Sequence, residues 1–228
     1  MSPIIFYFDD LSQPCRAIEI FLLMNDIPHD KKKIKLAKGA QYSDEFVKIN
    51  PFKKVPVIDD NGFILTESVA ILRYLCRQYN VQDHWYPNNS KLRARVDEYL
   101  EWQHIGTRAP CALYVWDKVF TPLLTGVGTN ERRLNNSFKR MEDSCNCIND
   151  IWLKDGKKFL TSYSISIADL LGVTELEELK LTGYDPKEGR PALAAWMERV
   201  RNATNPHYDK VHSRLNNLSK KYSTKAKL

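Results

Sequence analysis

The chain has 228 residues, 43% of them hydrophobic and 27% charged, a balance that excludes a disordered chain and supplies one large or two small cores. Its formal net charge of +6 lies largely in residues 31–33 and in the tail after Lys220, without interleaved aromatic side chains on a strand, so we expect solvated faces and no nucleic-acid partner. No apolar run has the length of a membrane span or the flanks of a signal peptide, so we expect no membrane partner either.

The first part of the chain alternates between strand and helix patterns. Residues 4–8 form an apolar run that predicts a buried strand, and residues 14–24 carry apolar side chains at helical spacing. In residues 33–36 apolar and basic side chains alternate, which predicts a second strand. A short helix over residues 42–49 must end before Asn50-Pro51, because proline cannot continue it.

A hairpin and a helix follow. The runs 55–58 and 63–65 flank Asp59-Asp60-Asn61-Gly62, whose residues tolerate left-handed turn conformations. Residues 67–79 then carry an apolar face at helical spacing. The order β-α-β-α-β-β-α predicts an α/β layer with an antiparallel edge.

The composition changes after residue 80. Residues 81–90 are irregular and contain Trp85-Tyr86-Pro87, which predicts a linker pinned by its aromatic rings. Beyond residue 90 strand patterns disappear, and apolar residues recur at helical spacing in three stretches: Leu92, Val96, Tyr99 and Leu100; Leu134, Phe138, Met141, Cys145, Ile148 and Trp152; Leu193, Trp196 and Val200. The sequence therefore predicts an α/β domain over residues 1–80, a linker over 81–90, and an all-α domain over 91–228 that ends in a basic tail.

A sequence motif marks the start of one helix in the second half of the chain. In Ser166-Ile167-Ala168-Asp169 the serine side chain can bond the Asp169 amide while the aspartate reaches back, which is a capping box. We expect this motif to start the core helix of the all-α domain and to serve folding rather than chemistry.

The five cysteines are odd in number and have no repeating spacing. We expect free thiols in a reducing compartment, with the cytoplasm as the first location. The last tripeptide, Ala226-Lys227-Leu228, is close to the peroxisomal Ser-Lys-Leu signal and makes the peroxisome the alternative. Cys145 and Cys147 point to different sides of a helix, and the histidines form no ligand pattern, so we expect no metal site.

The most informative segment is the first turn. A buried strand runs into a loop, and a helix begins at Pro14, a residue favoured in a first turn. Ser12 therefore lies at the helix entrance, where free N–H groups and the helix dipole favour an anion. The spacing from Ser12 to Cys15 is that of a thioredoxin-like CxxC motif with its first cysteine replaced. On this evidence alone, Ser12 could equally be a plain helix cap.

Two further segments bear on that choice. Val55-Pro56 precedes a strand where thioredoxin-like folds carry a cis-proline beside the active-site turn, which leaves the Val55 backbone free to pair with an extended peptide. Glu67 and Ser68 open the third helix, where Ser68 and the adjacent amides could hold a carboxylate and Glu67 an ammonium group. A plain helix start explains these last two residues equally well.

Together these segments resemble the theta-class glutathione transferases. The stretches that carry the resemblance are Leu11-Ser12-Gln13-Pro14-Cys15-Arg16, Asn50-Pro51-Phe52-Lys53-Lys54-Val55-Pro56, Leu65-Thr66-Glu67-Ser68-Val69-Ala70-Ile71-Leu72, Ala94-Arg95-Val96-Asp97-Glu98-Tyr99-Leu100, Trp85-Tyr86-Pro87 and Glu188-Gly189-Arg190-Pro191. The resemblance covers nearly the whole chain and fades after about Tyr208. It implies a thioredoxin-like N-terminal domain followed by the all-α domain of the glutathione transferase fold.

The resemblance also implies a site. Ser12 would donate a hydrogen bond to the glutathione thiolate, as the catalytic residue. The implied glutathione contacts are Gln41, Tyr42, Lys54, Val55, Glu67, Ser68 and Arg108. The implied electrophile pocket draws on Leu11, Cys111 and Trp116.

The implied reaction is conjugation of reduced glutathione, as co-substrate and without a cofactor, to small electrophiles such as alkyl halides and epoxides. Peroxidase activity towards organic hydroperoxides would accompany it, and the cleft's place near a two-fold axis implies a homodimer. Two rivals stay open: a thiol-disulfide oxidoreductase that uses Cys15, and a ligand-binding protein without catalysis on the same fold.

The sequence departs from the family at two places. Gln41 stands where theta enzymes often have a histidine that contacts the glycyl carboxylate, so we expect weaker glutathione binding. After Lys210 the chain is mostly Asn, Ser and Lys, which predicts a short or absent C-terminal lid over the cleft.

Overall fold

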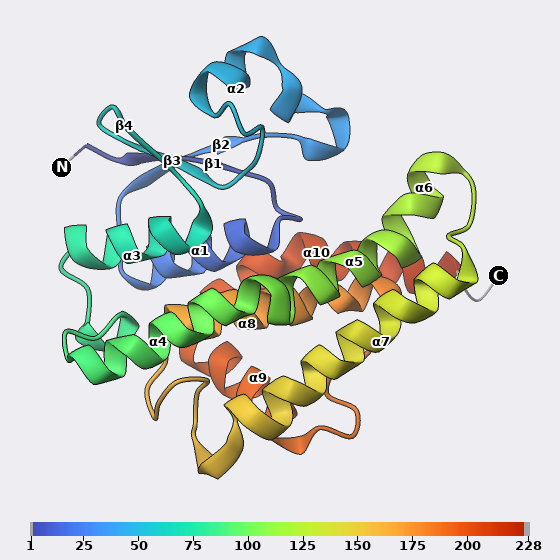
Figure 1. Ribbon diagram of the computed structural model, residues 1–228. Coiled ribbons are helices and arrows are strands. Elements are labelled where there is room, and N and C mark those ends of the chain that lie inside the picture. The colour runs from blue at the N-terminus through green and yellow to red at the C-terminus, as the bar shows by residue number, and fades with distance from the viewer. Residues whose placement is uncertain (1, 226–228) are drawn as a thin grey trace.

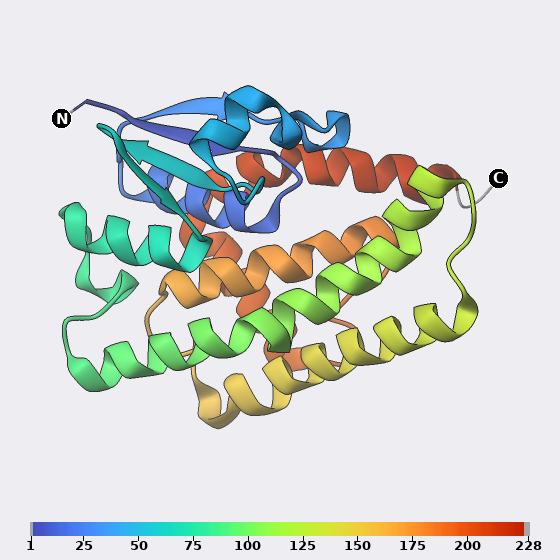
Figure 2. The same ribbon diagram turned by 45° about the horizontal axis from the view of Figure 1, so that its top comes forward.

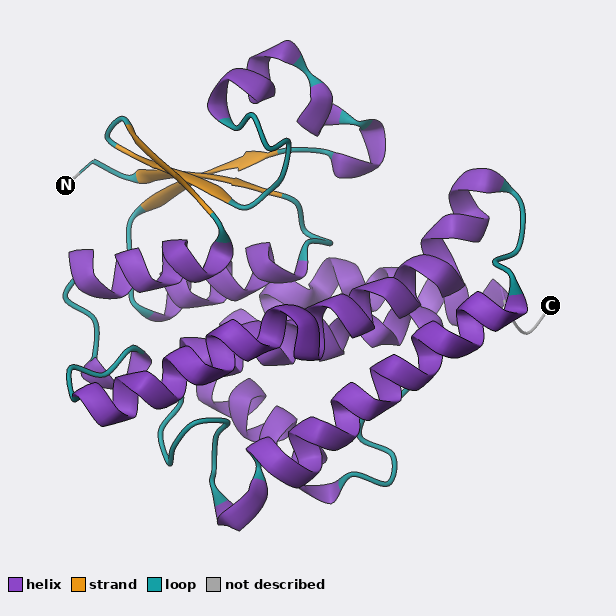
Figure 3. Ribbon diagram, viewed as in Figure 1, coloured by secondary structure: helices purple, strands orange, loops and turns teal. Residues whose placement is uncertain are grey.

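The computed structural model describes residues 2–225, and all its strands lie at one end of the molecule (Figures 1 and 3). In chain order the first elements are β1 (Ile4–Phe8), α1 (Gln13–Met24), β2 (His29–Lys33), α2 (Asp44–Ile49), β3 (Val57–Asp60), β4 (Phe63–Thr66) and α3 (Ser68–Gln78). The sheet order is β2-β1-β3-β4, with β2 parallel to β1 and the other neighbours antiparallel. Helices α1 and α3 cover the sheet face that looks towards the rest of the molecule, and α2 lies beyond the opposite face.

The second strand is not where the alternating pattern predicted it. β2 is His29–Lys33, paired from Ile4 with His29 to Phe8 with Lys33, whereas the prediction was 33–36. The prediction was wrong because β2 is an edge strand with mostly exposed polar and charged side chains, as edge strands often are, so no apolar alternation marks it.

Other boundaries shift by one or two residues for local reasons. The short helix α2 begins at Asp44 because the Ser43 hydroxyl accepts from the Phe46 amide at 3.3 Å. Strand β3 begins at Val57, since Pro56 has no N–H for the ladder.

The remainder of the described chain is helical. Its helices are α4 (Ser90–Gln103), α5 (Ala109–Val115), α6 (Thr121–Thr125), α7 (Glu131–Cys147), α8 (Ile167–Glu177), α9 (Pro191–Thr204) and α10 (His207–Lys225). Wider helical turns over His104–Arg108 and Trp116–Phe120 join α4, α5 and α6. Among residues 2–225 no helix combines the length and apolar composition that a membrane crossing requires.

Helix α8 is the centre of the molecule. All its residues are buried, and it contacts α1 on one side and α4 and α5 on the other, as Figure 2 shows. The predicted capping box at its start is confirmed: the Asp169 carboxylate accepts from the Ser166 amide at 2.9 Å. The same carboxylate accepts from the Leu160 amide at 2.9 Å and the Trp196 indole at 2.8 Å, which ties α8 to the preceding loop and to α9.

We expect Asp169→Ala to lower the free energy of unfolding by at least about 3 kcal/mol, because it leaves several buried donors without an acceptor. Denaturant unfolding measures the effect. Glu198→Ala, which removes an exposed carboxylate on α9, is the control and should cost under about 0.5 kcal/mol. Similar losses for the two variants would contradict the role given to Asp169.

Candidate active site

Ser12 lies between β1 and α1 with the extended backbone of an N-cap residue, φ −81° and ψ 116°. It is nonetheless not a side-chain cap, because its hydroxyl makes no capping hydrogen bond within the described first turn. Its main-chain groups are used instead: the amide donates to Asp9 at 3.0 Å and the carbonyl accepts from Arg16 at 3.1 Å. The backbone is thus fixed, and the hydroxyl contacts the neighbouring Cys15 thiol rather than capping the helix.

Buried groups hold the loop that carries Ser12. The Asp9 carboxylate accepts from the Leu11 amide at 2.9 Å and from the Leu36 amide at 3.2 Å. The Asp10 carbonyl accepts from the guanidinium of Arg16 at 3.1 Å. The loop therefore has little freedom to move Ser12.

A cleft of about 480 Å³ opens where the two halves of the chain meet. Predicted site residues from both halves line it: Lys54, Val55, Glu67, Ser68, Arg108 and Trp116. Pro14, from the first turn of α1, also lines it, whereas Ser12, two residues earlier, is 8% exposed and does not line it. A larger cavity of about 680 Å³ lies between α1 and α10, but none of the predicted site residues lines that one.

The remaining predicted site residues do not line the cleft. Leu11 belongs to the loop before α1, and Gln41 and Tyr42 lie in a helical turn over Ala40–Tyr42. Cys111 is buried, since α5 turns Ala112 and Leu113 towards the cleft and Cys111 towards the interior.

The sequence did not single out some residues of the cleft wall. His104 and Thr66 line it directly. Asn50 holds the loop before Pro56: its amide donates to the Lys54 carbonyl at 2.8 Å and its side-chain oxygen accepts from the Phe52 amide at 3.0 Å. Asn50-Pro51 had signalled only the end of a helix.

The backbone near the cleft is unusual at two non-glycine residues. Lys53 has φ 56° and Glu67 has φ 66°. Such left-handed conformations cost about 1–3 kcal/mol each and concentrate at ligand-binding turns. The peptide bond between Val55 and Pro56 is cis, as the fold interpretation predicted.

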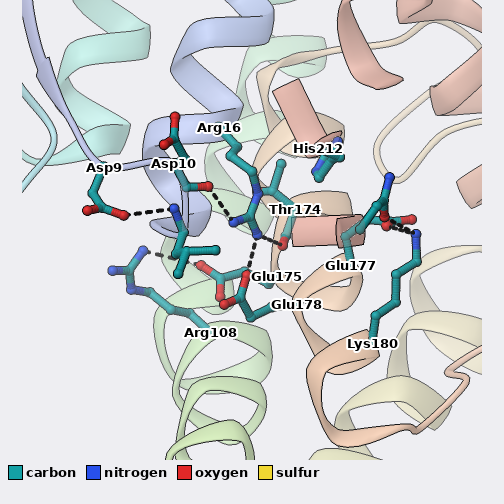
Figure 4. A network of polar contacts seen from close by, with 12 residues as sticks. Asp9, Asp10, Arg16, Arg108, Thr174, Glu175, Glu177, Glu178, Lys180 and His212 are labelled. Carbon is teal, nitrogen blue, oxygen red and sulfur yellow. Dashed lines mark hydrogen bonds and ion pairs between the residues drawn. The ribbon is translucent and has the colours of Figure 1, made fainter. Parts of the chain in front are cut away.

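The cleft contains charges of both signs. Lys54 and Arg108 supply positive charge and Glu67 negative charge. The Arg108 guanidinium also contacts Glu175 of α8 at 3.2 Å, a partner that the sequence did not suggest (Figure 4). Burial raises the pKa of Glu175 to about 7, with Arg108 acting against that rise.

Cys15 is buried beside Ser12. Burial raises the pKa of the Cys15 thiol to about 12, and a hydrogen bond with Ser12 offsets only part of the rise. A thiol in that state is a poor nucleophile, which weakens the redox hypothesis. Within residues 2–225 no three His, Cys, Asp or Glu side chains are grouped so that they could hold a metal ion.

Comparison with known proteins places this geometry in a family. Residues 7–77 match the model of the glutathione S-transferase N-terminal domain, and residues 128–203 match that of the C-terminal domain. The chain is 46% identical to human glutathione S-transferase theta-1 over 86% of its own length and 82% of the relative's, and 44% identical to mouse theta-3 over 85% and 80%.

Solved structures agree. The apo form of human glutathione S-transferase T1-1 superposes with a TM-score of 0.91 at 42% identity, over 95% of this chain and 91% of that one. A human theta-class glutathione transferase in complex with the glutathione conjugate of 1-menaphthyl sulfate gives 0.92 at 36% identity, over 98% and 91%.

We expect iodoacetamide at pH 7.5 to alkylate the partly exposed Cys147 first and the buried Cys15 and Cys111 last, because access and thiolate fraction both control the rate. Peptide mass spectrometry over a time course measures the order. Unfolded protein, in which all thiols should react alike, is the control. Alkylation of Cys15 as fast as Cys147 would revive the redox hypothesis.

Proposed function

This chain belongs to the theta class of the glutathione S-transferase family and is a glutathione transferase, and we propose that its Ser12 hydroxyl stabilises the thiolate of glutathione for transfer to a small electrophile. The observation that carries this role is the position of Ser12: it is the N-cap residue of α1, two residues before Pro14, which lines the cleft, and its hydroxyl is not used as a side-chain cap. A hydroxyl donor and a helix N-terminus there both favour an anion.

One serine is energetically sufficient. A free thiol has a pKa of about 8.5, so lowering it by about 2 units needs roughly 2.7 kcal/mol of preferential thiolate stabilisation. A hydrogen bond to a charged partner supplies about 1.5–3 kcal/mol, and a helix N-terminus about 0.3–1 kcal/mol more. Ser12 therefore works as a donor, and no base that would make it a nucleophile is needed.

The rest of the cleft suits the tripeptide. We assign the γ-glutamyl ammonium to Glu67 and its carboxylate to Ser68 with the first amides of α3. The Val55 backbone is assigned to the cysteinyl unit and Lys54 to the glycyl carboxylate. Gln41 and Tyr42 complete the glycyl end in this proposal.

The electrophile side is apolar and open. Leu113 and Trp116 are 40% and 50% exposed and line the cleft together with Arg108. We assign Leu11, in the loop before α1, to the same side although it does not line the cleft, whereas the burial of Cys111 leaves it no direct contact. No described residue of α10 lines the cleft, which favours access from solvent.

We place the substrate among alkyl halides and epoxides, with organic hydroperoxides as oxidants of glutathione. The human relative that was solved with a menaphthyl conjugate indicates that a related cleft accepts an aryl-methyl group. A panel of halomethanes, an epoxide, cumene hydroperoxide and an aryl halide tests this assignment. Turnover of the aryl halide alone would contradict it.

The same proposal includes the oligomeric state of the protein and its cellular location. A homodimer is supported by large apolar side chains left exposed on the monomer, such as Phe52, Phe63 and Leu92, and sedimentation tests it. The cytoplasm is supported by the free thiols. Ala226-Lys227-Leu228, on which the peroxisomal alternative rests, lies outside the described residues.

We expect Ser12→Ala to lower kcat/KM for conjugation by about 10–100-fold, because a hydrogen bond to a charged thiolate is lost. It should also raise the pKa of bound glutathione by about 1–2 units, measured from thiolate absorbance against pH. Cys15→Ala is the matched control on the same turn and should keep activity within about twofold. Loss of conjugation in Cys15→Ala but not in Ser12→Ala would establish the oxidoreductase, and glutathione binding without turnover of any electrophile would establish the carrier.

We expect Glu67→Gln to raise KM for glutathione about tenfold with a smaller change in kcat, since it removes a charged partner of the ammonium group. Steady-state kinetics with varied glutathione measure both constants. Glu45→Gln, an exposed change on α2 away from the cleft, controls for a general loss of negative charge. An unchanged KM would remove Glu67 from the binding site.

A further inference from the structure

The guanidinium of Arg108 forms an ion pair with a buried carboxylate. Its guanidinium lies on the cleft wall with the side chain 38% exposed, and its Nη1 is 3.2 Å from Oε1 of Glu175. The Glu175 side chain is 1% exposed and belongs to the buried helix α8 (Figure 4). The pair therefore joins the surface of the cleft to the centre of the molecule.

The neighbouring ion pair on the same stretch of helix is different. Glu178 pairs with Arg16 at 2.5 Å, both side chains are fully buried, and Arg16 has further acceptors in the carbonyls of Thr174 and Asp10. That pair is buried away from the cleft, although the Nε of Arg16 has no hydrogen-bond partner among residues 2–225. Glu175 instead has one oxygen on Arg108, while its buried Oε2 finds no hydrogen-bond partner among residues 2–225.

A guanidinium has five N–H donors in a fixed plane. Glu175 engages one terminal nitrogen of Arg108, so the other donors stay available on the cleft side. An arginine without such a partner would sample many rotamers, and fixing its plane removes that freedom before a ligand binds.

We propose that Glu175 is the positioning residue for Arg108, and that its carboxylate holds the guanidinium where glutathione and the electrophile meet. The functional part of this inference rests on the proposed conjugation in the cleft. The positioning part concerns only the two side chains and can be measured without turnover.

The ionisation of Glu175 makes the contact depend on pH. Burial raises its pKa to about 7; Arg108 and Arg16 lower it and Glu178 raises it. Because the folded pKa is raised, the carboxyl is ionised and holds Arg108 above about pH 7, and it takes up a proton and weakens the ion pair as the pH falls through that value. The titratable and charged groups that face it from the surrounding elements are Arg16 of α1, Tyr99 of α4, Arg108, Cys111 of α5 and Glu178.

The direct test measures how freely Arg108 reacts. Phenylglyoxal modifies accessible guanidinium groups, and peptide mass spectrometry gives the modification rate of Arg108 relative to that of the exposed Arg132. In the wild-type protein we expect this ratio to rise about three- to tenfold between pH 8 and pH 6, as Glu175 takes up its proton. The full-length protein without ligand is used.

Variants separate this contact from general effects of charge. In Glu175→Gln the ratio should be high and should not vary between pH 6 and pH 8. Glu177→Gln is the matched control, a buried carboxylate two residues along α8 whose partner is Lys180, and it should follow the wild-type curve. A wild-type ratio that does not change with pH, or a Glu175→Gln curve equal to the wild-type one, would overturn the proposal, and the first result needs no variant to fold.

Kinetics test the functional part. At pH 8 Glu175→Gln should lower kcat/KM about tenfold, and adding it to Arg108→Gln should cause little further loss, because both changes remove the same interaction. Additive losses, or unchanged kcat/KM in Glu175→Gln, would refute the functional part. If Ser12→Ala keeps full activity, the proposed role of Ser12 fails, while the phenylglyoxal ratio still decides whether Glu175 positions Arg108.

Discussion

A single buried guanidinium, Arg16, sets the relation between the two halves of the chain. It lies on α1, is 1% exposed, and bonds Glu178 and the Thr174 carbonyl on the helical side. Removing either partner of such a pair would leave a charge in the interior, which costs about 3–5 kcal/mol. Because the same guanidinium donates to the Asp10 carbonyl, the loop that carries Ser12 is fixed by the contact that joins the halves.

The cleft follows from that junction. The side that we assign to glutathione is built from the turns that enter β3 and α3, and the other side from the wider helical turn that carries Arg108 and from α5. Neither half of the chain forms both sides of the cleft by itself. Helix α8 and the turn that follows it support both sides, since Glu178 in that turn reaches α1 and Glu175 of α8 reaches the cleft wall.

Local signals let the sequence predict much of this arrangement. The helix entrance at Ser12, the Val55-Pro56 turn and the capping box at Ser166 each depend on a few adjacent residues, and a short motif suffices to find them. Features that depend on tertiary packing could not be predicted from the sequence. β2 is an edge strand without an apolar pattern, and Glu175 is one of several polar residues in a largely apolar helix, with nothing in the sequence to indicate its partner Arg108.

The direction in which a side chain faces is the other kind of information that the sequence lacks. Cys111 and Leu113 are two residues apart, and only the packing of α5 against α7 shows that the first is internal and the second lines the cleft. The structure is therefore needed to show which of the residues implied by family resemblance line the cleft and which do not.

Ser12 and Cys15 lie at the same helix start, and their surroundings give the two side chains different reactivity. Burial raises the pKa of the Cys15 thiol to about 12, so the thiol stays protonated at pH 7. The protonated Cys15 thiol therefore does not compete with the thiol of a bound substrate as a nucleophile. In the proposed mechanism the turn offers an incoming sulfur the Ser12 hydroxyl and the positive end of α1, both of which would stabilise a thiolate without being consumed. On that proposal the turn would not exchange disulfides efficiently but would ionise one substrate thiol after another, which is what conjugation requires.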